Sequence, residues 1–151
     1  MRDSPGHPSS EEALRRPFDT IAAANPTLDP VTGFLSRTAG LQAAAVLMAD
    51  VGTRQARLCA IWLDIDRFRQ VNESFGHAAG DGVIACIAER IRSAIGLPCA
   101  LLRMGGDEFV VLAPALDRSA ATQLGRQLLV EIRRPLNVDE LLIRPSASIG
   151  I

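Results

Sequence analysis

Apolar residues recur at spacings of three and four in several parts of the chain, and this period predicts amphipathic helices. The clearest cover residues 81–95, where one stripe holds four isoleucines, and residues 119–134, which end at Pro135. An Ala- and Leu-rich stretch predicts another helix over residues 38–51. A shorter helix over residues 13–24 is stopped by two X-Pro pairs, because proline disfavours helical conformation in the residue before it.

Shorter apolar runs between these helices predict strands. Residues 57–64 hold a continuous apolar run, which is typical of a strand buried on both faces. Residues 100–104 and 109–113 flank a glycine turn and predict a β-hairpin, and residues 136–138 and 141–151 predict further strands. This alternation leaves the α+β and α/β classes open, in either case with a helix-covered sheet.

The two ends of the chain depart from this regular pattern. Residues 1–12 are rich in Pro, Ser and Gly and show no apolar period, so we expect a flexible leader there. We assign residues 1–28 to leader and connector and residues 29–151 to one folded domain. The chain stops at Ile151 inside a strand-like run, and we therefore expect the C-terminal part of the domain to be missing.

Composition excludes several classes of protein. With 48% hydrophobic and 22% charged residues, the chain suits one folded domain rather than a disordered segment. Lys and Arg number 16 against 17 Asp and Glu, so the basic excess of duplex-binding proteins is missing and no nucleic-acid partner is expected. The apolar runs are too short to span a bilayer, and no signal-peptide pattern opens the chain. The 3 cysteines lack metal-ligand spacing, which favours reduced thiols and a cytoplasmic location.

Two acidic clusters lie where predicted strands end. Asp64 and Asp66 follow the first strand, and Asp107 and Glu108 follow the two glycines of the hairpin. Carboxylates in such places suit a hard cation, because Mg²⁺ prefers one or two of them with phosphate oxygens and water completing its octahedron. The alternative is that both clusters are solvated turn residues.

Asn72 and Asp81, between the clusters, have side chains suited to a purine, because an amide donates and accepts and a carboxylate accepts from guanine N–H groups. Each also has a structural interpretation. Asp81 begins the predicted helix over residues 81–95 and is a favoured N-cap type, whereas Asn72 suits a loop side chain bonded to its own backbone. We interpret His77 as a structural loop residue, since no catalytic triad partners accompany it.

Taken together, these residues resemble one protein family. Residues 105–109 read GGDEF, and residues 64–81 are similar to D-x-D-x-F-K-x-x-N-D-x-x-G-H-x-x-G-D. Residues 29–37 are similar to D-x-L-T-G-L-x-N-R, and residues 148–151 match the start of S-x-G-I-A. Four ordered motifs at matching spacing make the resemblance, over residues 29–151, specific to the GGDEF family of diguanylate cyclases.

The resemblance implies an α+β fold with a palm-like, mainly antiparallel sheet flanked by helices, similar to nucleotidyl cyclase catalytic domains. It implies bacterial second-messenger signalling, in which two GTP molecules are joined into cyclic di-GMP with release of pyrophosphate. Because one domain holds one GTP, catalysis implies a homodimer. Sensory domains or an EAL phosphodiesterase domain are the further partners that the resemblance suggests in a longer chain.

The resemblance also implies roles for the acidic clusters. Asp64, the carbonyl of Ile65 and Asp107 are implied as ligands of Mg²⁺ or Mn²⁺, which would neutralise α-phosphate charge and lower the pKa of the ribose 3′-hydroxyl. Asp107 and Glu108 are implied as the catalytic acids, with Glu108 near the attacking hydroxyl or a second metal.

Four further residues are implied to bind the substrate. Asn72 and Asp81 would read guanine, and Phe68 would help to wall the base. Arg69 stands where the family often has Lys, and both cations can touch phosphate with different geometry.

Three departures from the family pattern change the expectations. Ser36 replaces the commoner Asn of the opening turn, which is a minor change. Residues 96–99 lack the R-x-x-D of the family's product-binding inhibitory site, so feedback inhibition through that site is expected to be absent. The family's last helix and strand would lie beyond Ile151.

Three functions remain open from the sequence. The first is a diguanylate cyclase domain, which the intact acids at Asp107 and Glu108 favour. The second is a non-catalytic GTP-binding regulatory domain, for instance beside a cyclic di-GMP phosphodiesterase domain. The third is a dimerisation or scaffold domain.

Overall fold

The computed structural model describes residues 10–151. In chain order its elements are α1 (Ser10–Ala23), α2 (Arg37–Thr53), β1 (Leu58–Ile65), α3 (Phe68–Ala94), β2 (Ala100–Arg103), β3 (Glu108–Pro114), α4 (Arg118–Ile132), β4 (Leu136–Val138), β5 (Leu141–Ile143) and β6 (Ala147–Gly150). The predicted helices over residues 13–24, 38–51 and 119–134 and the predicted hairpin are confirmed within a few residues. The predicted leader lies outside the described residues as far as residue 9, and its last three residues belong to α1. No helix in the described part is both long and apolar enough to cross a membrane.

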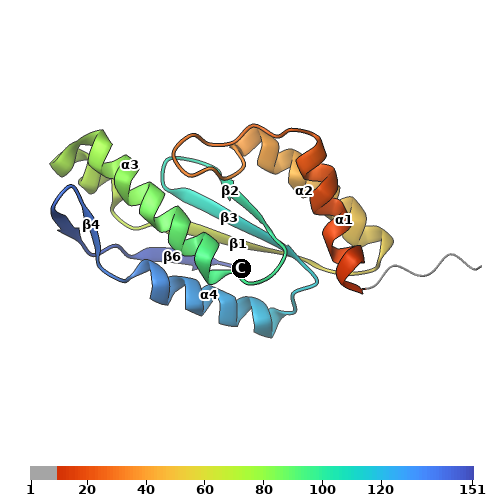
Figure 1. Ribbon diagram of the computed structural model, residues 1–151. Coiled ribbons are helices and arrows are strands. Elements are labelled where there is room, and N and C mark those ends of the chain that lie inside the picture. The colour runs from red at the N-terminus through yellow and green to blue at the C-terminus, as the bar shows by residue number, and fades with distance from the viewer. Residues whose placement is uncertain (1–9) are drawn as a thin grey trace, which may run out of the picture.

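A four-stranded antiparallel sheet in the order β2-β3-β1-β6 forms the centre of the molecule, and β4 and β5 pair as a separate ribbon. Helices α3 and α4 cover one face (Figure 1), where Ile87 and Leu128 share a core with Ile61 and Phe109. Helix α2 covers the other face over β2 and β3, and α1 packs beside α2. Helices around an antiparallel sheet confirm the α+β class.

Strand β1 is buried on one face only, so the prediction of two buried faces is wrong. Ile61 and Leu63 are 0% and 1% exposed beneath α3 and α4. Trp62 on the opposite face is 42% exposed, and Ala60 is exposed beside it. The reason is that α2 covers mainly the β2–β3 half of this face, which a continuous apolar run cannot reveal.

Helix α3 begins at Phe68, well before the predicted start at residue 81. It is interrupted at Gly76, whose φ of 85° and ψ of 165° leave helical geometry and favour glycine. Asp81 therefore lies within the helical segment after this kink and does not cap it, so the N-cap interpretation of Asp81 is wrong.

The predicted strand over residues 141–151 is divided into β5 and β6. Pro145 separates the two strands, because it cannot donate a hydrogen bond to a ladder. Strands β4 and β5 are joined by Asp139 and Glu140, whose φ values of 47° and 69° fit a tight hairpin turn with positive φ at both positions. Strand β6 then returns to the main sheet beside β1.

Candidate functional site

The end of β1 and the start of β3 bring the two acidic clusters together. Asp64 lies opposite Glu108 in the antiparallel register. The backbone N–H of Ile65 donates to the carbonyl of Asp107 over 3.1 Å. Strand pairing therefore places Asp64, Ile65, Asp107 and Glu108 at one end of the sheet.

Asp64 shows the electrostatic effect of this grouping. Burial, followed by the negative charges of Asp107 and Asp66, raises the pKa of its carboxyl above the ordinary value. Such a site gains from a bound cation, which would relieve the repulsion.

The donor atoms at this end of the sheet fit magnesium. Within residues 10–151, no group of three or more His, Cys, Asp or Glu side chains gathers closely enough to hold a metal ion alone. The carboxylates of Asp64 and Asp107 and the carbonyl of Ile65 could hold Mg²⁺, whose usual shell combines one or two carboxylates with phosphate and water.

Asp66 has a different role from Asp64, although the two are neighbours in the sequence. Its carboxylate accepts hydrogen bonds from Ser146 Oγ over 2.7 Å and from Ser148 Oγ over 2.8 Å. These two bonds hold the pKa of Asp66 below its ordinary value. Asp66 thus ties the end of β1 to β6 and is not free to join the other acids.

Replacing Asp66 with alanine is expected to lower the free energy of unfolding by about 1 kcal/mol at pH 7, since partly exposed hydrogen bonds lie at the low end of the usual range. A carboxyl with a lowered pKa stabilises the fold above about pH 4, and this contribution is lost as the pH falls through its folded-state pKa. In urea unfolding, the deficit of Asp66→Ala relative to wild type should therefore be smaller at pH 3 than at pH 7. Ser148→Ala, which removes one of the two bonds, should show a smaller loss, and an equal deficit of Asp66→Ala at both pH values would contradict this account.

A pocket with a cavity volume of about 480 Å³ lies beside the acids. It is lined by Phe68, Arg69, Asn72, Glu73, His77, Gly106 and Asp107. Phe68, Arg69 and Asn72 are thus brought together with Asp107, whereas Asp64, Ile65, Asp81 and Glu108 are not among the lining residues. His77, which we interpreted as a loop residue, lies in α3 just after the kink and lines the pocket.

Asn72 and Phe68 are fitted against a glycine of α3. A Cβ atom at Gly80 would lie 1.8 Å from Asn72 Oδ1 and 3.3 Å from Phe68 Cζ. Only glycine therefore allows the amide of Asn72 to pack against this turn of α3. On the outer side, Arg69 Nε lies 2.7 Å from Glu73 Oε1 in an exposed ion pair at the rim of the pocket.

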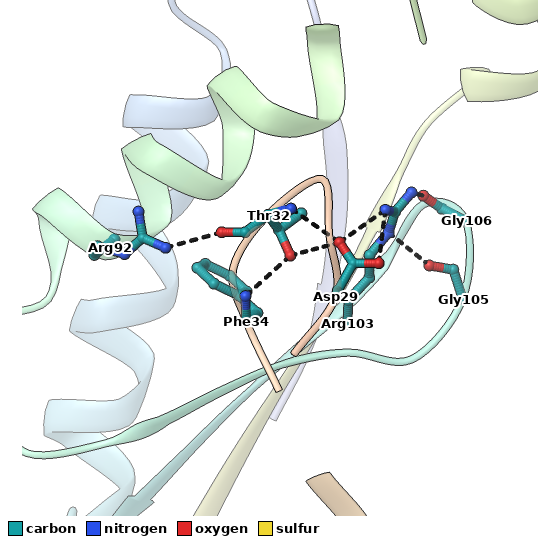
Figure 2. Close-up of polar contacts among 7 residues, drawn as sticks. All are labelled: Asp29, Thr32, Phe34, Arg92, Arg103, Gly105 and Gly106. Atoms are coloured by element: carbon teal, nitrogen blue, oxygen red, sulfur yellow. Dashed lines mark hydrogen bonds and ion pairs between the residues drawn. The ribbon is translucent and has the colours of Figure 1, made fainter. Parts of the chain in front are cut away.

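Arg103 is a site residue that the sequence reasoning missed. Its Nη1 contacts both carboxylate oxygens of Asp29, at 3.0 and 3.1 Å. Its Nε donates to the carbonyl of Gly105 over 3.1 Å and its Nη2 to that of Gly106 over 2.7 Å. Figure 2 shows this single guanidinium between the turn at Asp29 and the glycine turn that precedes Asp107. The sequence motif over residues 29–37 includes Asp29, but it does not indicate that Asp29 pairs with Arg103.

The turn that carries Asp29 is itself held rigidly. Burial raises the pKa of Asp29, but hydrogen bonds from Thr32 and Arg103 outweigh it and leave the pKa below the ordinary value. Thr32 Oγ1 donates to Asp29 over 2.8 Å and accepts from the N–H of Phe34 (Figure 2). The rings of Phe34 and Phe109 pack edge to face, with their centroids 5.9 Å apart. The guanidinium carbon of Arg92 lies 5.2 Å from the centroid of the Phe34 ring. The turn therefore connects α3 to the hairpin that bears the acids.

Comparison with known proteins agrees with these motifs. The family model "Diguanylate cyclase, GGDEF domain" matches residues 26–151. Diguanylate cyclase TpbB of Pseudomonas aeruginosa is 34% identical over 106 residues, covering 69% of this chain and 24% of that protein. Cyclic di-GMP phosphodiesterase NbdA of the same organism is 32% identical over 123 residues, covering 82% of this chain and 16% of that protein. The chain thus spans less than a quarter of either relative.

Solved structures of GGDEF domains share this fold. The GGDEF domain of DgcB from Caulobacter crescentus, solved in complex with c-di-GMP, superposes with a TM-score of 0.77 at 27% identity and covers 82% of this chain and 75% of that chain. This similarity confirms the predicted palm-like fold. Together with the match of the family model over most of the chain, it shows that the chain belongs to the GGDEF family.

Proposed function

We propose that this domain is a diguanylate cyclase, which binds GTP and condenses two GTP molecules into cyclic di-GMP with release of two pyrophosphates. The observation that carries the proposal is the meeting of Asp64 with the complete GGDEF hairpin at one end of the sheet. The similarity to TpbB, which is named a diguanylate cyclase, supports it.

Asp64, the Ile65 carbonyl and Asp107 hold Mg²⁺ or Mn²⁺ in this proposal. When bound, the ion neutralises charge on the α-phosphate and lowers the pKa of the attacking 3′-hydroxyl. Glu108 lies across the strand pair from Asp64 and accepts the proton of that hydroxyl. The hairpin turn, fixed by Arg103, keeps Asp107 and Glu108 in place.

The pocket beside the acids receives the nucleotide. Asn72 of the pocket lining pairs with the edge of guanine together with Asp81, which lies outside the lining but follows Gly80, the glycine against Asn72. Phe68 forms part of the wall behind the base. Arg69 at the rim contacts phosphate. Because one pocket holds one GTP, two domains must face each other to bring each 3′-hydroxyl in line with the opposing α-phosphate.

The test is incubation of the full-length protein with GTP and Mg²⁺, followed by nucleotide analysis. We expect cyclic di-GMP and pyrophosphate, with an initial rate that rises faster than linearly with enzyme concentration while the monomer dominates. Calorimetry should show that GTP binds more tightly than ATP, and more tightly with Mg²⁺ than without. Binding of GTP without any product, at every enzyme concentration, would exclude the cyclase.

The second candidate is a non-catalytic GTP-binding regulatory domain. The similarity to NbdA, which is named a cyclic di-GMP phosphodiesterase, favours it. In that case GTP binds without turnover and changes the activity of a phosphodiesterase domain in the same protein. Measuring hydrolysis of cyclic di-GMP with and without GTP separates the two candidates.

Product should not inhibit this enzyme through the segment over residues 96–99. That segment offers no Arg or Asp to pair with the phosphates or guanines of cyclic di-GMP. Burial raises the pKa of Cys99 to about 11, so its thiol stays neutral. Initial rates with and without micromolar cyclic di-GMP should agree, and strong inhibition that persists when Asn72 is altered would contradict this prediction.

A further inference from the structure

Asp81 lies between two glycines that are both in close contact with other side chains. On one side, Gly80 faces the amide of Asn72. On the other side, a Cβ atom at Gly82 would lie 2.5 Å from Val138 Cγ1, a distance that no real contact allows. The turn of α3 that bears Asp81 is thus held between Asn72 and the β4–β5 ribbon.

Val138 can act as a rigid contact because it is well anchored. It is 8% exposed and shares the core with Leu136 and with Val83, the residue after Gly82. A valine side chain is also stiff about χ1, since two heavy atoms branch from its Cβ. It therefore cannot move aside as a long, flexible side chain would.

The segment that carries Val138 is fixed at both ends. At the start, Arg90 of α3 donates to the carbonyls of Ile132 over 3.1 Å and Pro135 over 2.7 Å. At the far end, the hydroxyls of Ser146 and Ser148 bond to Asp66. The β4–β5 ribbon is thereby tied to α3 and to the end of β1 that carries the candidate metal ligands.

Asp81 itself has nothing else to orient it. Its side chain is exposed, and no group within residues 10–151 forms a hydrogen bond to its carboxylate. The helical turn therefore fixes where the side chain of Asp81 starts, and no other contact in the described part of the chain fixes its position.

We propose that Val138 is a positioning residue for guanine recognition: by filling the notch at Gly82, the β4–β5 ribbon holds Asp81 at the distance from Asn72 that guanine requires. This inference rests on the proposed binding of GTP by Asn72 and Asp81. It adds an element that lies outside the four sequence motifs and that sets the selectivity of the site.

The test uses the full-length protein and compares Gly82→Ala, Val138→Ala and the double variant. Gly82→Ala forces the turn away from Val138, so we expect GTP affinity to fall about tenfold while ATP affinity stays unchanged. The double variant should recover GTP affinity to within about threefold of wild type, because coupled neighbours compensate, and Val138 Cβ would lie at an ordinary contact distance of 3.6 Å from the new methyl group. Calorimetry with Mg²⁺ and each nucleotide gives the GTP-to-ATP ratio.

Two controls separate positioning from stability. Gly52→Ala makes the same change where no atom lies within 4 Å of the new methyl group. Val51→Ala shortens a side chain of α2 that is 7% exposed, and is expected to lower the melting temperature. Both should leave the GTP-to-ATP ratio unchanged.

Each outcome decides a separate point. If Gly82→Ala folds and keeps the wild-type GTP-to-ATP ratio, the positioning role of Val138 is refuted. The same holds if the double variant folds but does not regain GTP affinity. Neither result would affect the proposed guanine site itself. Should Gly82→Ala fail to fold, Val138→Ala decides: removal of the contact must reduce the ratio at least about threefold, and an unchanged ratio refutes the role. Equal binding of GTP and ATP by the wild type would overturn the proposed guanine site, and this inference with it.

Discussion

Asp107→Asn is expected to lower the rate of cyclic di-GMP formation by about a thousandfold, because the proposed metal site loses one of its two carboxylates and each 1.36 kcal/mol of lost stabilisation is a factor of ten. The variant should also lose the Mg²⁺-dependent part of its GTP affinity. Asn keeps the shape of the side chain, and the N–H of Ile65 bonds to the backbone carbonyl of residue 107, so the strand pairing is retained.

The same substitution should make the protein more stable without ligand. The negative charge of Asp107 contributes to the raised pKa of Asp64. A raised carboxyl pKa means that stability falls as the pH rises from the unfolded-state pKa through the folded-state pKa, so removing Asp107 relieves a cost present at neutral pH. Asp19→Asn, which alters an exposed carboxylate on α1, serves as the control and should change neither property. An Asp107→Asn variant with near wild-type turnover would remove the basis of the proposed metal site.

Arg103→Ala should lower the free energy of unfolding by about 3 kcal/mol, because it leaves a largely buried carboxylate without its partner. The two side chains are only 12% and 18% exposed. Turnover should fall as well, since Gly105 and Gly106 lose the donors that hold the turn before Asp107. Urea unfolding and initial rates measure the two effects.

Arg134→Ala provides the matched control for this ion pair. Its partner is Glu131, and their side chains are 68% and 34% exposed, so its loss should cost no more than about 0.5 kcal/mol.

Adding Asp29→Ala to Arg103→Ala should recover part of the stability, because the uncompensated negative charge of Asp29 is removed. The wild type should also lose stability as the pH falls through the lowered pKa of Asp29, and Arg103→Ala should show a weaker dependence, since only the hydrogen bonds from Thr32 remain to lower that pKa. Equal losses in Arg103→Ala and Arg134→Ala would show that the Asp29 pair contributes little.

Helix α4 could be predicted because its apolar residues recur at helical spacing along one buried face. Helix α2 could be predicted from an Ala- and Leu-rich stretch, and the β2–β3 hairpin from two short apolar runs on either side of a glycine turn. The start of α3 could not, because its first part is broken at Gly76 by a conformation that glycine alone adopts easily. The exposure of Trp62 was equally hidden, since it depends on which part of the sheet α2 covers.

The candidate site, too, has features that the sequence predicts and features that it does not. Asp64 and Glu108 stand at strand ends that the sequence marks clearly, but only the folded sheet shows that these two strands pair. The contact between Arg103 and Asp29 joins residues 74 positions apart, and no local pattern predicts it. The separation of Asp66 from Asp64 depends on Ser146, just before β6, and Ser148, within it, and only the folded register brings them near.

The exposed face of β1 also determines what the intrinsic fluorescence of the protein can report. Trp62 is the 1 tryptophan of the sequence and lies two residues before Asp64. Because Trp62 is already 42% exposed, unfolding should shift its emission only slightly, and intrinsic fluorescence should understate the loss of structure. The same exposure makes Trp62 a sensitive reporter of anything that covers this face, since a second surface laid over the indole would move its emission to the blue. Aqueous quenchers such as iodide or acrylamide should reach this ring in the free chain and lose access once the face is covered.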